Sequence, residues 1–437
     1  MARTLWLYNL YRALCTAHLH KAVFVFVFLA RGLSMAEILL LQTIFTGAAF
    51  ALEVPTGAWA DRLGRRRSMR LGSLLMAVAS VGYFVAPGFA ALALCEFTFA
   101  AGLTLTSGAD SAYLYDQLEA AGRAREYLRR EAAANAAKYV GLGVAAAAGG
   151  LLAFVRSPDA TFLVTAVTCA GAFGVTFFFP ATHRSGHSRS AASASRSPGL
   201  VRGMRQGLGT IRRSPALCWV LAYSALLFTL VILSGTLFQP VLKNQGFNFL
   251  GIGLVFAGLN FVGAASALRL GRATWSRWQE PILWLLPALL VFCYLFMGLL
   301  GPLMVVGLMI GHYVVTGVYS PVVKTLINEE VSDSGVRATV LSAESAAKRL
   351  VLLAVAPLLS LVFKLTGTGD AGTAPSAVAM RPVLLVCSGL AGLAFVAQYF
   401  YQRHRRAQRV AADVRGVPET SRIDRPSSAA VPVRAAE

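Results

Sequence analysis

The sequence predicts an all-α polytopic membrane protein of twelve transmembrane helices, arranged as two pseudo-symmetric six-helix bundles. The composition is 56% hydrophobic and only 14% charged, with a mean hydropathy of +0.62, whereas a soluble domain carries about 25% charged residues. Apolar stretches of about 18 or more residues, the length that crosses a bilayer core, recur along the chain. Short motifs also recur in the two halves of the sequence. Together these observations predict a duplicated membrane fold.

Twelve apolar stretches follow one another, and turn-forming residues separate them. The first, LWLYNLYRALCTAHLHKAVFVFVFLARG, has no convincing small-residue cleavage site, so we interpret it as a retained helix and not as a signal peptide. The breaks include Pro87-Gly88, Ser157-Pro158, Gly301-Pro302 and a polar tract after Thr366. The predicted helices are residues 8–31, 37–59, 69–87, 89–115, 131–155, 160–180, 216–239, 247–269, 281–299, 302–324, 337–364 and 381–402.

Arginine and lysine are concentrated in alternate connections. One set contains ADRLGRRRSMR, GRAREYLRR, RLGRATWSR and the tail RHRRAQR, while the other holds little beyond Arg31, Arg156, Lys243 and Arg381. The positive-inside rule therefore predicts that both termini lie in the cytoplasm. We expect a multi-pass protein of the plasma membrane (bacterial inner membrane). We interpret Arg12 as part of this bias. Because the basic residues of the net +20 charge adjoin the spans, they indicate anionic lipid headgroups as partners and not nucleic acid.

A Ser/Arg/Gly-rich tract without apolar periodicity divides the chain. We predict an N-terminal bundle at residues 1–181, a cytoplasmic linker at 182–213, a C-terminal bundle at 214–403 and a disordered cytoplasmic tail at 404–437. RLGR at 62–65 recurs 207 residues later, Ser107-Gly108 recurs 209 residues later as Thr316-Gly317, and Ala136-Ala137-Lys138 recurs 210 residues later. Such duplication is typical of secondary transporters, whose substrate site lies between the halves. A membrane scaffold without transport activity is the alternative.

The end of the second predicted helix carries a specific motif. Residues 57–67, GAWADRLGRRR, contain every fixed position of G-x-x-x-D-R-x-G-R-R-[KR] and resemble the signature between helices 2 and 3 of the major facilitator superfamily. The LE-x-P-T-G before it and SGADSAYLYD in helix 4 resemble bacterial efflux-type members. The resemblance covers the chain to about residue 403, and it implies transport by alternating access.

The resemblance also implies that this motif is a cytoplasmic gate between the halves. Glu53, Gly57 and Asp61 have i, i+4, i+8 spacing and share one helix face. The resemblance places that face against helix 11, with Gly57 allowing close approach, Asp61 at the helix N-terminus, and Arg65 paired with Asp116. The simpler alternative is an arginine cluster that only sets orientation. The gate residues are Gly57, Asp61, Arg62, Gly64, Arg65, Arg66 and Asp116.

Several ionisable residues lie within predicted spans, where they are costly and usually paired or functional. Lys348 can pair with Glu53 on helix 2 or with Glu344 one turn away, and Lys138 can pair with Asp110 at about equal depth. Structural pairing and proton transfer are both open for these residues. Glu96 has no cation near it in sequence and is the freer proton carrier. The charge and proton candidates are Glu53, Glu96, Asp110, Lys138, Glu344 and Lys348.

Two signatures of proton-driven drug antiporters are missing, which puts proton antiport in question. Helix 4, LCEFTFAAGLTLTSG, contains no arginine, and helix 5 has Ala-Ala within GLGVAAAAGG where the signature has Gly-Pro. The small-residue surface for close helix packing is nevertheless retained. The expected cavity is mostly apolar and suits amphipathic or aromatic molecules. Its polar candidates are His18, Tyr223, Gln239, His312 and Tyr313.

Enzyme chemistry has no motif to support it. HExxH, GxSxG and nucleotide-binding loops are absent, and the six cysteines lie singly in apolar segments, so we expect no metal site and no cofactor. The leading hypothesis is a proton-coupled antiporter that exports hydrophobic or amphipathic small molecules. Uptake or facilitated exchange of a metabolite is the alternative, and a receptor or an enzyme is disfavoured. The expected partners are a small-molecule substrate, protons and anionic lipids, and the expected state is a monomer.

Overall fold

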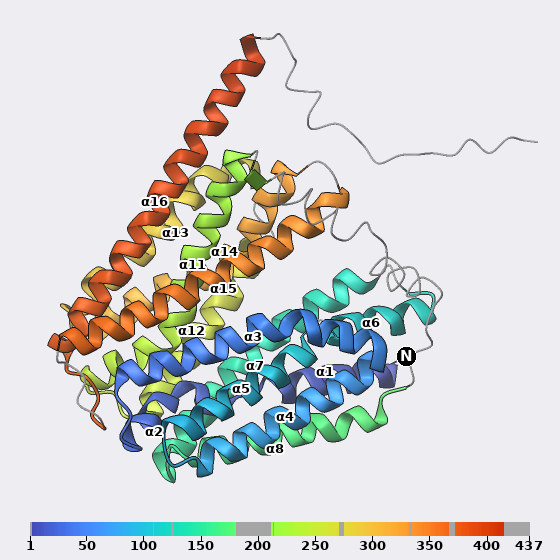
Figure 1. Ribbon diagram of the computed structural model, residues 1–437, viewed down its shortest axis with the longest axis vertical. Coiled ribbons are helices and arrows are strands. Elements are labelled where there is room, and N and C mark those ends of the chain that lie inside the picture. The colour runs from blue at the N-terminus through green and yellow to red at the C-terminus, as the bar shows by residue number, and fades with distance from the viewer. Residues whose placement is uncertain are drawn as a thin grey trace, which may run out of the picture.

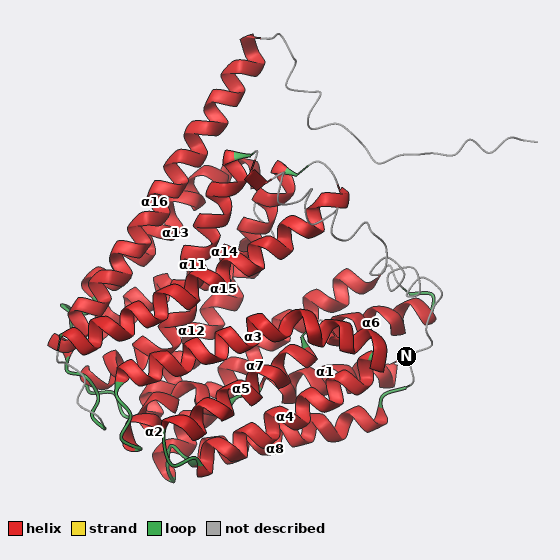
Figure 2. Cartoon of the chain, viewed as in Figure 1, coloured by secondary structure: helices red, strands yellow, loops and turns green. Residues whose placement is uncertain are grey.

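The computed structural model describes residues 2–107, 109–123, 126–180, 211–212, 214–270, 275–331, 334–366 and 372–414. In these residues the regular structure is helical throughout (Figure 2). The first half contains α1 (Ala2–Thr16), η1 (Leu19–Ala22), α2 (Phe24–Ala30), α3 (Met35–Leu63), α4 (Arg65–Val85), α5 (Phe89–Thr106), α6 (Ala109–Ala120), α7 (Tyr127–Val155), α8 (Ala160–Val175) and η3 (Thr176–Phe178). The second half contains α11 (Pro215–Asn244), α12 (Phe249–Leu270), α13 (Trp275–Phe296), α14 (Pro302–Glu330), α15 (Ser334–Leu365) and α16 (Ala377–Val414).

The described part of the chain has eleven helices long and apolar enough to cross a membrane. A twelfth span results when α1 with η1 and α2, which meet at a 49° bend, are counted together. The prediction of an all-α polytopic membrane protein is therefore confirmed. Our expectation of one continuous first helix at 8–31 is wrong, because residues 17–23 interrupt it. The last helix is also longer than the predicted span 381–402, since α16 continues past residue 403 to Val414. Most of the predicted linker and of the predicted tail, residues 181–210 and 415–437, lies outside the described residues.

The helices form two bundles, α1 to α8 and α11 to α16 (Figure 1). Two helix pairs make the main contact between them, α3 with α15 and α7 with α12. In the order of the membrane spans, α3 and α15 are spans 2 and 11, and α7 and α12 are spans 5 and 8. Interchanging the two halves converts one pair into the other, which is the relation expected from an internal duplication.

Glycines bring α7 and α12 into backbone contact. A Cβ atom added at Gly150 would lie 2.6 Å from the Cα atom of Gly253, and a Cβ at Gly253 would lie 2.6 Å from the Cα of Gly150. No side chain fits between the helices at this point, so only small residues allow the approach. The small-residue surface predicted for the fifth span therefore packs against the second half of the molecule.

The bundles meet at one end and spread apart toward the other (Figure 1). We call the spread end, with the α3–α4 turn at Gly64 and the end of α6, the basic end. At the opposite end, hydrogen bonds join the halves: Gly372 N–H donates to Leu33 O at 3.2 Å, and Ser360 Oγ donates to Ala36 O at 2.9 Å. The closed end is thus held by main-chain groups of both halves.

Candidate functional site

The first span is broken where it passes between the two bundles. Backbone groups released from helical bonding are costly in a bilayer unless other groups satisfy them. Here Thr165 Oγ1 of α8 accepts a hydrogen bond from Leu19 N–H at 3.1 Å, and Thr168 Oγ1 donates to Ala17 O at 3.1 Å. Gly149 of α7 makes room for the turn, because a Cβ there would lie 2.1 Å from Leu19 O. The break is therefore a supported part of the fold.

Gln239 connects the second bundle to the same break. Its side chain is fully buried, its Oε1 atom accepts from Val25 N–H at 3.1 Å, and its Nε2 atom donates to Lys21 O at 3.0 Å. We expected Gln239 to line the substrate cavity, but the structure places it on the backbone of the first span. It satisfies two groups on either side of the break and links the two halves at that point.

A cavity of about 240 Å³ lies beside the break. Ile232, Gly235 and Thr236 of α11 contribute to its wall, and the rest comes from the break with η1 and from α2, α3, α4, α5 and α8 of the first bundle. Its volume is somewhat below the roughly 300–1,000 Å³ of typical ligand pockets. The aromatic side chains of the wall are Phe24, Phe28, Phe45, Tyr83, Phe99 and Phe162. Such a surface suits a small molecule with a flat apolar part.

Three polar side chains of the cavity, His18, His20 and Lys21, come from the broken span. His18 is 5% exposed, and both of its ring nitrogens lack a hydrogen-bond partner within the described structure. His20 stacks on Phe162 with a centroid distance of 4.8 Å, and its Nδ1 atom lies 3.2 Å from Thr165 Oγ1. An imidazole without partners presents a donor or an acceptor to a ligand. A broken span that carries polar groups to a cavity is a common transporter binding site.

Glu96 of α5 is the one carboxylate among the residues that line this cavity. It is 5% exposed, and its charged and hydroxyl neighbours are Lys21 and Tyr83. No cation stands near Glu96 in the sequence, but the break in the first span brings Lys21 to it. A carboxylate and an ammonium group therefore share a cavity that is largely apolar.

The remaining expected cavity residues lie elsewhere. Tyr223 donates its hydroxyl to Leu283 O at 2.9 Å, and His312 is fully buried with Nε2 3.3 Å from the Tyr294 hydroxyl. Tyr313 packs near the His312 ring at a centroid distance of 6.0 Å. These side chains belong to the packing of the second bundle. Of the five predicted residues, only His18 is among those lining the described cavity.

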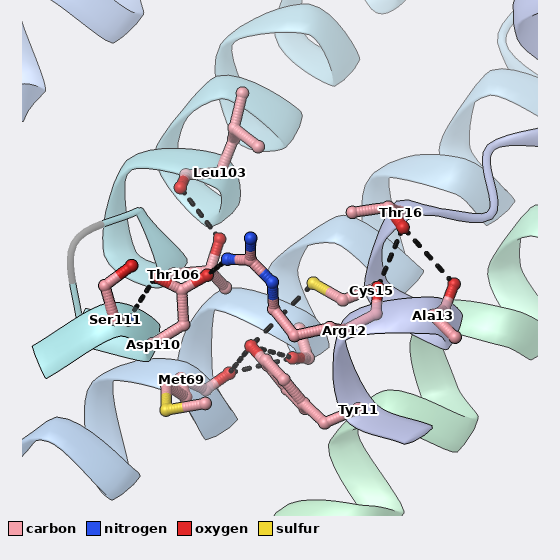
Figure 3. Close-up of polar contacts among 11 residues, drawn as sticks. Tyr11, Arg12, Ala13, Cys15, Thr16, Met69, Leu103, Thr106, Asp110 and Ser111 are labelled. Atoms are coloured by element: carbon pink, nitrogen blue, oxygen red, sulfur yellow. Dashed lines mark hydrogen bonds and ion pairs between the residues drawn. The ribbon is translucent and has the colours of Figure 1, made fainter. Parts of the chain in front are cut away.

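Arg12 of α1 and Asp110 of α6 form an ion pair between the first and fourth spans (Figure 3). Their side chains are only 14% and 11% exposed, and Asp110 Oδ1 also accepts from Ser111 N–H at 2.7 Å. Our expectation that Asp110 pairs with Lys138 is therefore wrong. Arg12, which we interpreted as part of the positive-inside bias, is held in this pair. In the sequence, only the position of Arg12 within an apolar span indicates that it forms an ion pair.

The other predicted charges form local or inter-bundle pairs. Lys348 Nζ lies 2.9 Å from Glu344 Oε1, which also accepts a hydrogen bond from Ser224. This is the i, i+4 alternative, and the pairing of Lys348 with Glu53 is not observed. Glu53 instead pairs with Arg349 across the bundles, with Nε and Oε2 3.2 Å apart.

The motif at the basic end shows part of the expected gate. Arg65 Nε lies 2.9 Å from Asp116 Oδ2, and Gly64 has a φ of 92°, a backbone conformation that favours glycine. Arg66 donates to Phe177 O at 3.2 Å, while Arg62 is exposed. The expected close approach at Gly57 is not observed, since no described atom lies within 4 Å of a Cβ there. The side chain of Asp61 lies outside the described part.

Three comparisons place this geometry among known proteins. A family model described as Major Facilitator Superfamily matches residues 16–347, and no curated protein sequence matches the chain. Several crystal structures are similar. They include a mutant of the nucleoside transporter NupG (TM-score 0.78, 13% identity, 91% of this chain and 98% of that one). Another is a bacterial homolog of the human lysosomal transporter Spinster, inward-facing and occupied (0.70, 16%, 93% and 97%). A third is peptide transporter POT with sulfate (0.65, 14%, 92% and 94%).

Proposed function

The chain belongs to the major facilitator superfamily, and from this premise we propose that it is a secondary active transporter that exports amphipathic small molecules in exchange for protons. The observation that carries the proposal is the cavity at the broken first span. It is lined by both bundles, is largely apolar with six aromatic side chains, and contains a buried carboxylate and a histidine without hydrogen-bond partners in the described structure. These features fit an occupant that is largely apolar and makes a few directed polar contacts.

The arrangement of the bundles supports transport by alternating access. We assign the basic end to the cytoplasm on the positive-inside rule, which makes the spread end the cytoplasmic opening and the joined end the external closure. The hydrogen bonds of Ser360 to Ala36 and of Gln239 to the first span would then have to break for the cavity to open outward. The exposed Arg67 and Arg406 suit anionic headgroups at the cytoplasmic surface of a bacterial inner membrane. We expect a monomer to suffice.

Glu96 is the proton carrier in this proposal. Its carboxyl group can bind and release a proton inside a cavity that is lined largely by apolar side chains. When Glu96 takes up a proton, Lys21 loses its counter-charge and the polarity of the cavity changes. Proton binding and substrate binding are coupled through this change. The direction of transport rests on the resemblance of the LE-x-P-T-G and SGADSAYLYD segments to efflux-type members.

Proton-coupled transport can be measured in liposomes. The purified protein is reconstituted with a trapped pH-sensitive dye, a pH gradient is imposed, and amphipathic fluorescent dyes and aromatic acids are added one at a time. At least one compound is expected to collapse the gradient in liposomes with protein and not in empty ones. An uncoupler should abolish its accumulation. If the transport rate of every compound is independent of the pH gradient, proton coupling is ruled out. If compounds bind but are not transported, the protein is a receptor.

A further inference from the structure

Three basic side chains meet at the inner face of the first span: Arg12, Lys21 and Lys138. Arg12 is paired with Asp110, and Lys21 has Glu96 as a neighbour. Lys138 has no carboxylate partner among the described residues. The groups with which it interacts electrostatically are Arg12, Lys21 and His18, all of them basic. Among the described residues, one positive charge is therefore unmatched here.

Lys138 stands on a face of α7 that is turned toward the first span, and it interacts electrostatically with His18 and Lys21, which line the cavity. Lys138 and Gly141 lie three residues apart on α7 and share a face of that helix. A Cβ atom at Gly141 would lie 3.8 Å from Thr16 Oγ1 of α1, so this face is turned toward the first span. Lys138 is exposed, although it lies at the start of an apolar span.

The corresponding lysine in the second half behaves differently. Lys348, 210 residues later, is neutralised by Glu344 at 2.9 Å. Near Lys138, the buried Nε–H group of Arg12 also has no hydrogen-bond acceptor in the described structure. Both ring nitrogens of the neighbouring His18 are likewise without partners. Charges within a membrane protein are normally paired or functional, so these groups are available to an acceptor from outside the chain.

We propose that Lys138 binds an anionic group of the transported molecule, a carboxylate, while an aromatic part of that molecule enters the cavity walled by Phe24, Phe45 and Phe99. The substrate class is then a small aromatic organic anion. This inference rests on the proposed function and makes it more specific. It also agrees with export, because an inside-negative membrane potential favours the exit of an anion, by roughly 2.3 kcal/mol per charge per 100 mV.

The test compares binding of a charged and an uncharged ligand of the same shape. The full chain in lipid nanodiscs is titrated with 1-naphthoate and with 1-naphthamide, and binding is followed by calorimetry. The wild type is expected to bind 1-naphthoate about tenfold more tightly, as one charge-assisted hydrogen bond predicts. Lys138→Gln should remove this preference and leave 1-naphthamide binding unchanged, whereas Lys138→Arg should retain it. Lys324→Gln, at an exposed lysine of α14 that is not among the cavity-lining residues, serves as the matched control.

Thermal unfolding separates a binding role from a structural one. An unmatched charge stabilises nothing, so ligand-free Lys138→Gln should unfold at or above the wild-type temperature. A clear decrease would show that Lys138 is structural and would overturn the inference. So would wild-type protein that does not bind 1-naphthoate or does not prefer it, or a variant Lys138→Gln that keeps the preference. The transport proposal fails on a different result, the absence of substrate-driven proton flux in liposomes.

Discussion

Replacing Glu96 with glutamine is expected to abolish accumulation driven by a pH gradient, while exchange of substrate across the membrane without a gradient continues. Glutamine has nearly the same shape and keeps a hydrogen-bonding group beside Tyr83, but it cannot gain or lose a proton. Because Glu96 is the carboxylate of the cavity, its loss removes the step at which proton binding alters substrate binding. The expected change in gradient-driven accumulation is complete loss, to the level of liposomes without a gradient.

The experiment measures both activities in the same liposomes, gradient-driven accumulation and counterflow of labelled substrate. Glu280→Gln is the control, because Glu280 lies on α13 with 54% of its side chain exposed and pairs with the exposed Arg406. This control should behave as wild type in both assays. If Glu96→Gln still accumulates substrate in response to the gradient, protons are carried by another group, and the role assigned to Glu96 is wrong.

Replacing Asp110 with asparagine is expected to lower the free energy of unfolding by about 3–5 kcal/mol, the range seen when one partner of a buried ion pair is removed. The Arg12 guanidinium would remain in the protein without a counter-charge, and its Nε atom already lacks an acceptor in the described structure. The measurement is denaturant-induced unfolding of the reconstituted protein. Glu280→Gln, which removes the carboxylate of an exposed ion pair, is the matched control and should change the free energy of unfolding by at most about 1 kcal/mol.

Removing both charges distinguishes the ion pair from other effects of the substitution. Arg12→Met combined with Asp110→Leu fills similar space with apolar groups and leaves no buried charge, so it should recover most of the lost stability. A double variant less stable than Asp110→Asn would mean that the pair itself makes a large net contribution. Asp110→Asn with wild-type stability would contradict the structural role of the pair.

The fold could be predicted from the sequence because its signals are local or repeated. Span length follows from apolar stretches, and the duplication of the motif at Arg62 and Arg269 predicts the symmetry that α3, α15, α7 and α12 show. The Lys348–Glu344 pair was among the predictions because its residues are four apart on one helix. Glycines in the fifth span likewise indicated the close packing found at Gly150.

The site could not be predicted to the same extent, because its contacts join distant segments. No proline or glycine marks the break after Thr16, and the groups that support it come from Thr165 and Gln239, far away in sequence. The partner of Asp110 was missed since depth along a helix does not say which neighbour a side chain faces. Tyr223 and His312 stand on helices expected to line the cavity, but they lie on faces turned to the second bundle's interior.

In the transport cycle that we propose, the two bundles separate at the end opposite the basic end. A disulfide between Ala36→Cys and Ser360→Cys tests it, because Ser360 Oγ contacts Ala36 O at 2.9 Å across the bundles. The pair is placed in a background where the exposed Cys218 is replaced by serine. Oxidation is expected to stop substrate flux in liposomes and reduction to restore it. Undiminished flux through fully cross-linked protein would contradict alternating access about this cavity.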